Sequence, residues 1–289
     1  MIRATYELEP AGSAEALAIE ASLGMEAGPD FVRGRVVSEA HGVAVIDFPE
    51  HNWGSSIAAI LSGVVVGEGM ETRTLSRCRL AGLELPDGLL PGPAYAAAPG
   101  VAVGAIVKPS LGLGPAEVAA VAGALARGGA VLVKDDEMLC DPPWCPLEER
   151  VAGVAAALDG SAVSYCANIT GPSPTLVGRA RRVVDLGATG VMVNAFTQGL
   201  EGLLALRQAG LGVPILAHRV GSGPWARNDR FGVTGAVVAQ LTRLCGADYV
   251  MAGAFGGKLF DSDDDVRAEL AAIRGPLGGA PAATAVLGG

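Results

Sequence analysis

The sequence predicts an α/β protein of two domains, an N-terminal α+β domain of ferredoxin-like type (residues 1–95) and a (β/α)8 TIM barrel domain (residues 96–289). The first observation behind this prediction is a Pro- and Gly-rich stretch, residues 85–100, which is typical of a linker. The second is a strict alternation of apolar β runs with helical segments after it, which is typical of a parallel sheet covered by helices. The third is that polar residues follow the β runs directly, where barrels carry their catalytic groups.

The elements of the N-terminal domain follow from short apolar runs and turn residues. The pattern predicts a strand at residues 2–8, a helix at 13–22, a hairpin of strands at 32–39 and 42–47, and a second helix that starts at 55–61.

Seven β runs and six helical segments make up the barrel domain, so about seven strands of the barrel are present. The predicted strands are 101–107, 130–134, 162–166, 190–193, 214–217, 249–252 and 284–287. The predicted helices are 115–127, 147–158, 174–186, 200–209, a long helix that ends near residue 246, and 263–274. The eighth unit is lacking, which would leave two unpaired sheet edges, so we expect the natural protein to continue past Gly289.

Composition and charge exclude several classes of protein. The chain has 21 basic and 30 acidic residues, and no basic stripe alternates with aromatic residues, so nucleic acid is not expected as a partner. No apolar run reaches the ~18 residues of a membrane span, and the polar N-terminus lacks the apolar core of a signal peptide. Five irregularly spaced cysteines favour a reducing, cytoplasmic location.

The stretch VLVKDDE, residues 131–137, carries the most specific chemistry. If it begins as a buried strand, the period of two places Lys134 and Asp136 on one face, with Glu137 just past the strand end. Asp136 and Glu137 are ligands suited to Mg²⁺, but an ordinary Lys134 ammonium would oppose the ion unless it were chemically altered or turned away. A salt bridge between Lys134 and Asp136, with no metal, is the alternative.

Polar residues follow the other predicted strands too, and we interpret them as one ring around an active site. They are Lys108, Asn168, Asn194, His218 with Arg219, and the segment 253–258. Each has a plainer alternative: the stem of Lys108 could cover apolar surface, and His218 could be a core histidine. The acidic run Asp261–Asp265 is expected to cap a helix. Cys140 and Cys145 lack a second pair of ligands for zinc.

The order of several motifs resembles the large subunit of ribulose bisphosphate carboxylase (RuBisCO). The motifs are GAIVKPSLGLGP (104–115), GGAVLVKDDE (128–137), ANIT (167–170), HR (218–219) and GGKL (256–259), together with TYELEP (5–10) and IEASLG (19–24) near the N-terminus. Each motif alone is weakly specific, but the ordered set covers nearly the whole chain.

This resemblance implies a role for each matching residue. Lys134 resembles the lysine that takes up CO2 as a carbamate, which with Asp136 and Glu137 would complete a Mg²⁺ site. Lys108 resembles the lysine that transfers a proton next to the substrate carbonyl. The remaining roles are a proton-transferring or orienting group (His218), a phosphate clamp (Arg219), a mobile-loop lysine (Lys258) and a glutamate supplied by the neighbouring subunit (Glu20). The resemblance thus implies a homodimer and a phosphorylated substrate.

Departures from the carboxylase pattern change the expected reaction. Ser110 stands where carboxylases have a second lysine, residues 61–70 contain no asparagine, Met251 replaces a histidine, and Leu287 replaces a serine. Each lost polar partner would cost ~1 to 3 kcal/mol if a substrate group stayed unpaired, so carboxylation is not expected. The pattern resembles RuBisCO-like proteins, which implies enolisation, isomerisation, decarboxylation or transcarboxylation of a phosphorylated keto compound. A non-catalytic or truncated paralogue is the alternative, and a genuine carboxylase is the least favoured one.

Overall fold

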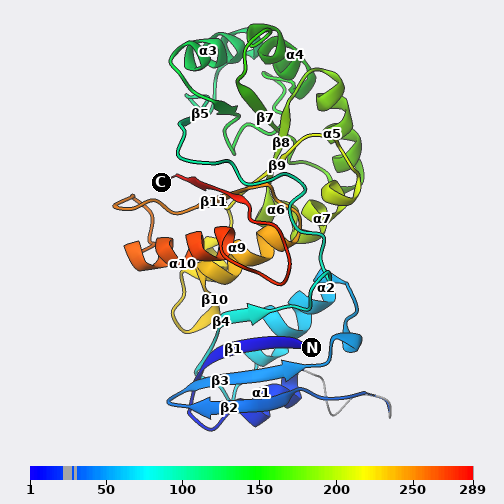
Figure 1. Ribbon diagram of the computed structural model, residues 1–289, viewed down its shortest axis with the longest axis vertical. Helices are drawn as coiled ribbons and strands as arrows, with labels where there is room; N and C mark the ends of the chain where they lie inside the picture. The colour runs from blue at the N-terminus through cyan, green and yellow to red at the C-terminus, as the bar shows by residue number, and fades with distance from the viewer. Residues whose placement is uncertain (22–27, 29–30, 289) are drawn as a thin grey trace.

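The computed structural model contains two sheets, one at each end of the long axis of the molecule (Figure 1). It describes residues 1–21, 28 and 31–288. The lower sheet has five strands in the order β10-β4-β1-β3-β2. Its strands are β1 (Ile2–Glu9), β2 (Arg35–Ala40), β3 (Val43–Phe48), β4 (Arg77–Glu84) and β10 (Phe231–Val233). Strand β1 shows why it forms here, because its alternate residues Ile2, Ala4, Tyr6 and Leu8 are all buried.

The predicted ferredoxin-like arrangement is confirmed. Helix α1 (Ala14–Ala21) follows β1, and helix α2 (Ile57–Ile60), which continues as a π-helical turn (Leu61–Val65), precedes β4. This βαββαβ order with β1 between β3 and β4 is the split-βαβ motif. Strand β4 was not predicted. Three short 3-10 turns complete the list: η1 (Glu50–Asn52), η3 (Glu68–Met70) and η4 (Ser173–Thr175).

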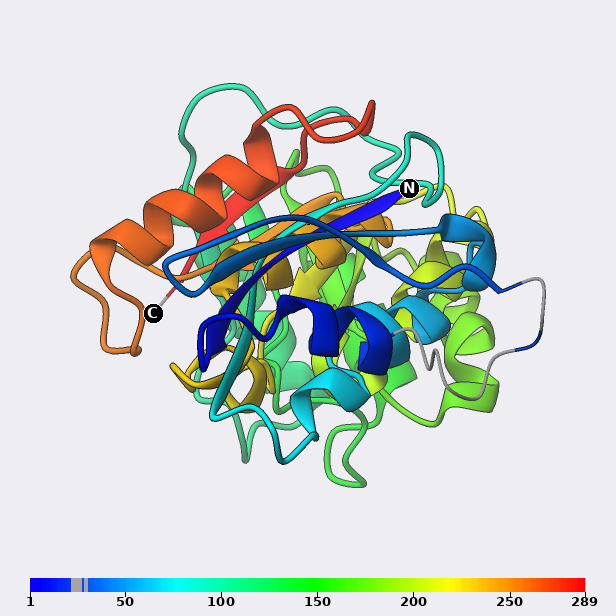
Figure 2. The same cartoon turned by 90° about the horizontal axis from the view of Figure 1, so that it is seen from below.

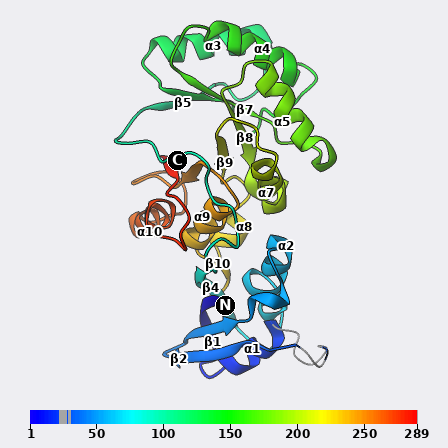
Figure 3. The same cartoon turned by 45° about the vertical axis from the view of Figure 1, so that its right-hand side comes forward.

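The upper sheet confirms the prediction of seven parallel barrel strands. They are β5 (Gly104–Ile106), β6 (Leu132–Lys134), β7 (Ser164–Asn168), β8 (Gly190–Asn194), β9 (Ile215–His218), β11 (Tyr249–Ala252) and β12 (Thr284–Leu287), in the order β5-β6-β7-β8-β9-β11-β12. The sheet curls, and helices cover its outer face (Figures 1 and 3). Over the described residues, β5 and β12 are its two edges.

The helices of the barrel part of the chain are α3 (Pro115–Arg127), α4 (Leu147–Ala157), α5 (Leu176–Asp185), α6 (Ala195–Gln198), α7 (Leu200–Gln208), α8 (Gly223–Ala226), α9 (Gly235–Leu244) and α10 (Asp263–Arg274). Of these, α3, α4, α5, α7 and α10 match predicted segments closely, whereas the short helices α6 and α8 were not predicted. The predicted cap of α10 is confirmed, because the Ser262 hydroxyl accepts from the Asp265 amide and the Asp265 carboxylate accepts from the Ser262 amide. None of the described helices is long and apolar enough to cross a membrane.

The prediction of one long helix ending near residue 246 was wrong. The chain forms the short helix α8, then strand β10, and then α9, whose first turn is capped by the Thr234 hydroxyl. The Asn228 side chain accepts from two amides of the intervening turn, and Gly232 has φ +115°, so no helix can run through this segment. Strand β10 pairs in parallel with β4, so the barrel part of the chain adds a strand to the N-terminal sheet. The domain boundary at residue 95 therefore stays a prediction.

Two layers of side chains fill the upper sheet on its concave side. The lower layer is an apolar cluster: Leu132, Cys166, Met192, Leu216 and Met251. Two positions further along four of these strands stand Lys134, Asn168, Asn194 and His218, which form a polar layer at the C-terminal ends. Because side chains two positions apart lie on the same face of a strand, each of these four strands adds one polar side chain next to its apolar one, on the side of the C-terminal ends. Seen from below, the N-terminal strands lie in front of this barrel (Figure 2).

Candidate active site

A cleft of about 390 Å³ opens at the C-terminal ends of the barrel strands. Its polar lining includes Lys108, Glu137, His218, Arg219 and Lys258, all of which were predicted site residues. Its apolar lining is Ile106, Val220, Met251, Leu259 and Phe260. The structure therefore brings the polar ends of β5, β6 and β9 together with the loop that precedes α10.

Lys108 and Asp136 form the shortest ion pair of the cleft. The Lys108 Nζ atom lies 2.5 Å from Asp136 Oδ2, and it also donates to the Ser110 hydroxyl at 2.8 Å. Ser110 in turn donates to Asp136 Oδ2 at 3.0 Å, while the Met138 amide donates to Oδ1 at 2.9 Å. Burial opposes ionisation of Asp136, but these hydrogen bonds, led by that of Lys108, hold its pKa below the ordinary value.

Lys134 ends strand β6 and is 3% exposed. Its Nζ atom donates to the Asp135 carbonyl at 3.0 Å and lies 3.7 Å from Glu137 Oε2. Lys134 thus pairs with Glu137, whereas Asp136 pairs with Lys108. Burial lowers the pKa of Lys134, and the neighbouring carboxylates only partly oppose this shift. A lowered pKa increases the share of the neutral amine, which is the form that reacts with CO2.

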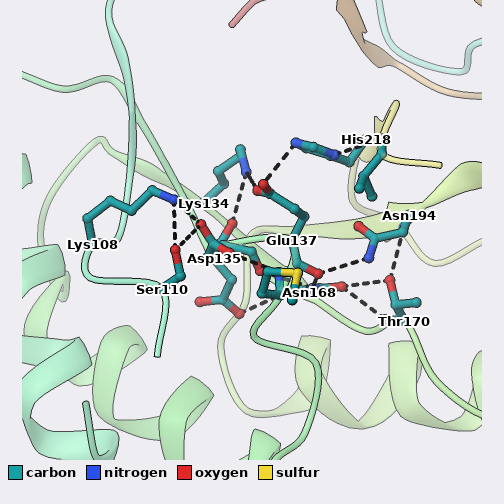
Figure 4. Close-up of polar contacts among 12 residues, drawn as sticks. Lys108, Ser110, Lys134, Asp135, Glu137, Asn168, Thr170, Asn194 and His218 are labelled. Atoms are coloured by element: carbon teal, nitrogen blue, oxygen red, sulfur yellow. Dashed lines mark hydrogen bonds and ion pairs between the residues drawn. The ribbon is translucent and has the colours of Figure 1, made fainter. Parts of the chain in front are cut away.

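His218 ends strand β9 and faces the same carboxylate. Its Nδ1 atom accepts from the Val220 amide at 3.1 Å, so in the neutral ring Nε2 carries the proton. Nε2 lies 3.4 Å from Glu137 Oε2 (Figure 4). Burial lowers the pKa of His218 to about 4, with a smaller contribution from the Lys134 charge. The ring is therefore a neutral donor at pH 7.

Two asparagines of the polar layer hold the backbone of the loop after β6 (Figure 4). Asn168 Nδ2 donates to the carbonyls of Asp136 and Glu137, at 3.1 and 3.2 Å. Asn194 Nδ2 donates to the Glu137 carbonyl at 2.9 Å. Thr170 links the two asparagines, because its hydroxyl donates to Asn168 Oδ1 and accepts from the Asn194 amide. The sequence predicted that both asparagines lie at the site, but it did not predict that they hold the backbone of this loop.

Arg219 borders the cleft with its guanidinium already bonded. Nη1 donates to both carboxylate oxygens of Glu269 at 3.2 Å, and Nη2 donates to Asp261 Oδ1 at 2.8 Å. The Phe260 ring lies over the same group. Burial raises the pKa of Glu269, although the Gly253 amide and Arg219 counteract this. The phosphate-clamp role of Arg219 stays a prediction.

The last two predicted site residues, Lys258 and Glu20, lie in different parts of the structure. Lys258 is exposed on the rim of the cleft. Glu20 belongs to α1, which packs on the N-terminal sheet at the opposite end of the chain, and its side chain lies outside the described part of the structure. The segment IEASLG also extends into residues that are not described. The contribution of Glu20 across a dimer stays a prediction.

The side chains at the end of β6 would suit a hard divalent cation only if Lys134 were converted to a carbamate. Among the described residues, no group of three or more His, Cys, Asp or Glu side chains could hold a metal ion. Asp136 and Glu137 supply only two carboxylates, and the buried Lys134 amine stands beside them. Conversion of this amine to a carbamate would remove a positive charge and add oxygen ligands, which Mg²⁺ prefers. The donor set fits the ion once Lys134 is carbamylated.

Sequence reasoning missed a buried set beneath this loop, namely Asp135, Arg150 and Tyr165. Arg150 is fully buried in α4, and its Nε donates to Asp135 Oδ2 at 3.1 Å. The signal was present, because Arg150 falls on the same helix face as Leu147, Val151 and Val154, all of which are buried. A charge on an apolar helix face needs a buried partner.

Fold and site together define a class: an α/β-barrel protein with lysines and carboxylates gathered at the C-terminal ends of its strands. Residues 93–274 match the family model of the ribulose bisphosphate carboxylase large chain, catalytic domain. The chain belongs to this family.

Relatives and solved structures agree with this assignment. An uncharacterized ribulose bisphosphate carboxylase-like protein of Bordetella bronchiseptica is 35% identical over 76% of this chain and 56% of its own length. A 3-oxo-isoapionate-4-phosphate transcarboxylase/hydrolase of Xanthobacter autotrophicus is 32% identical over 84% of this chain and 63% of its own length. The Rubisco of Pyrococcus horikoshii superposes with a TM-score of 0.90 at 26% identity, covering 100% of this chain and 76% of that one. The chain thus spans less than two thirds of the length of the Bordetella and Xanthobacter relatives.

Proposed function

We propose that this chain forms part of a magnesium-dependent RuBisCO-like enzyme that enolises a phosphorylated keto compound and does not fix CO2. The observation that carries the proposal is the convergence of Lys108, Lys134, Asp136, Glu137 and His218 at the C-terminal ends of the barrel strands β5, β6 and β9. The Xanthobacter relative, which is named for transcarboxylation or hydrolysis of a phosphorylated keto acid, supports this class of substrate.

In this proposal Asp136, Glu137 and a carbamate on Lys134 would hold Mg²⁺. The ion, when bound, would supply positive charge that offsets the negative charge of an enediolate. The remaining side chains that line the cleft do not bind the ion in this proposal, so they are available for proton transfer and substrate binding.

Lys108 is the proposed acid or base for the proton on the carbon next to the substrate carbonyl. Lys108 lines the cleft, and its amine lies beside the Asp136 carboxylate, which fixes its position. His218 is proposed to orient a substrate oxygen, since it lines the cleft, its Nε2 atom lies beside the Glu137 carboxylate there, and its neutral ring donates without adding charge. Arg219 is the candidate ligand of a substrate phosphate, Lys258 is the proposed mobile-loop lysine over the site, and Glu20 of a second copy would complete the site.

The experiment is a proton-exchange assay. Phosphorylated ketoses and keto acids are incubated with the protein in D2O with Mg²⁺ and bicarbonate, and deuterium uptake next to the carbonyl is followed by NMR. We expect uptake with the wild type and a loss of about 10²-fold or more with Lys108→Ala, because a positioned acid or base contributes roughly this factor. Arg182→Gln, which breaks an exposed ion pair with Glu148, is the control and should exchange normally. Equal uptake by the wild type and Lys108→Ala contradicts the role of Lys108, and no uptake by the wild type supports a non-catalytic paralogue.

A further inference from the structure

One buried arginine, Arg150 of α4, forms hydrogen bonds with several groups of the loop after β6, residues 135–145. Arg150 Nη1 donates to the Cys145 carbonyl at 3.0 Å. Nη2 donates to the carbonyls of Leu139 and Cys140, at 3.2 and 3.0 Å. Together with its bond to Asp135, the planar guanidinium thus joins four points of the loop. Only an arginine offers this fork of donors in a fixed plane.

Asp135 is the second part of the same set, and both of its carboxylate oxygens are occupied. Oδ1 accepts from the Tyr165 hydroxyl at 2.8 Å, and Oδ2 accepts from Arg150 and, at 2.9 Å, from the Asn168 amide. Asp135, Arg150 and Tyr165 are all 1% exposed or less. A buried ion pair adds little stability over an apolar core, so its presence under this loop needs another reason.

Chain direction gives that reason. Asp135 lies between Lys134 and Asp136, and successive side chains of an extended chain point to opposite sides. Anchoring Asp135 on the helix side of the sheet therefore turns Lys134 and Asp136 toward the cleft. The Asp135 carbonyl also accepts from the Lys134 amine at 3.0 Å, which fixes the position of this amine.

We propose that Asp135, Arg150 and Tyr165 are positioning residues that present Lys134, Asp136 and Glu137 to the cleft. Their role does not extend to contact with substrate or metal, since they lie beneath the loop on the side of α4. The assignment rests on the proposed function, because it gives the loop the task of holding an ion. It goes further by naming the residues that set the geometry of that loop.

Tyr165→Phe is the principal test, because it removes one hydroxyl and retains the ring. The first measurement is amide hydrogen exchange of residues 136–140 by mass spectrometry, where the Met138 and Leu139 amides bond to Asp136. The second is the Kd for Mg²⁺, measured by calorimetry in bicarbonate buffer. We expect exchange at least about tenfold faster and Mg²⁺ binding about tenfold weaker, the size typical when a residue that orients a metal ligand is lost.

Tyr6→Phe is the matched control. It also removes a buried tyrosine hydroxyl bond, to the Val64 carbonyl, but in the N-terminal sheet. A purely structural role for Tyr165 would make the two variants alike in melting temperature and leave exchange of residues 136–140 unchanged in both. That result would overturn the proposal.

Arg150→Lys is the second variant, since it retains the charge beside Asp135 and loses the fork. We expect faster exchange across residues 139–145 than in Tyr165→Phe. Unchanged exchange there would overturn the assignment of Arg150. If the wild type binds no Mg²⁺, the proposed function fails, while the exchange measurements still decide whether these residues position the loop.

Discussion

The Nζ atom of Lys108 lies 2.5 Å from Oδ2 of Asp136, so a proposed proton-transfer group and a proposed metal ligand form an ion pair. They meet because β5 and β6 are neighbours in register, with Ile106 beside Lys134. Any cation bound by Asp136 must therefore share this carboxylate with a lysine.

The first prediction follows from this competition. Lys108→Met removes a positive charge beside the ion site, and at ~4 Å in a water-like medium one unit charge changes the binding of a divalent ion by about 2 kcal/mol, or about 30-fold. We expect Mg²⁺ to bind about 30-fold more tightly to this variant, as measured by calorimetry. Binding that weakens would contradict it, because Lys108 would then support the ion site instead of competing with it.

The second prediction has the opposite sign. Lys134→Ala removes the amine that would become the third oxygen ligand, and we expect tight Mg²⁺ binding to be abolished. NMR with ¹³CO2 should show a carbamate signal in the wild type and none in this variant. Lys258→Ala, on the rim of the cleft, is the control and should bind Mg²⁺ normally. Retained binding in Lys134→Ala would return this lysine to the role of a partner for Glu137.

The barrel strands and the identity of the residues at their ends could be predicted, because both follow from local periodicity. Strand β4 was missed because a register shift opposite Thr5 and Tyr6 breaks its alternation, so that Cys78 and Leu80 are buried but the next buried residue is Leu83. Strand β10 has three residues, and its partner β4 is about 150 positions away. No local pattern could reveal that pairing.

Pairings within the site were unpredictable for a similar reason. Spacing along one strand offered a salt bridge between Lys134 and Asp136 as the alternative to a metal site, whereas in the structure Asp136 pairs with Lys108, which follows the neighbouring strand. The sequence suggested a phosphate-clamp role for Arg219. It did not indicate that the Arg219 guanidinium pairs with Asp261, in the loop before α10, and with Glu269, in α10 itself. Which of several charges meet depends on loop conformations that sequence spacing does not specify.

The third prediction concerns this arginine. Arg219→Met leaves Asp261 and Glu269 buried without their cation, and we expect a loss of about 3 kcal/mol or more in the free energy of unfolding. Urea unfolding measures it. Arg267→Met is the matched control, because Arg267 also pairs with an aspartate, Asp264, but at an exposed position. Its loss should stay below about 1 kcal/mol. Equal losses of unfolding free energy in the two variants would show that the buried pairs of Arg219 with Asp261 and Glu269 contribute no more than an exposed pair.

The fourth prediction tests the interior of the barrel. A Cβ atom on Gly190 would lie 2.6 Å from the Cys166 sulfur, so Gly190→Ala overfills the apolar layer. We expect a loss of about 1 to 3 kcal/mol in the free energy of unfolding. The double variant Gly190→Ala/Cys166→Ala removes the clash, so its loss should be smaller than the sum of the two single losses. Strict additivity would show that the two positions do not touch.

The fifth prediction concerns pH and Asp47, a buried carboxylate bonded to Arg3 and Arg35. The hydrogen bond from Arg3, more than any other interaction, lowers the pKa of Asp47. A carboxyl with a lowered folded-state pKa stabilises the protein above its unfolded pKa of ~3.9 and loses this contribution as pH falls through the folded value. Asp47→Asn cannot titrate, so its melting temperature should lie furthest below that of the wild type above about pH 5, and the gap should close in acid. A gap that stays constant between about pH 2 and 7 would show that the charge of Asp47 contributes nothing to the fold.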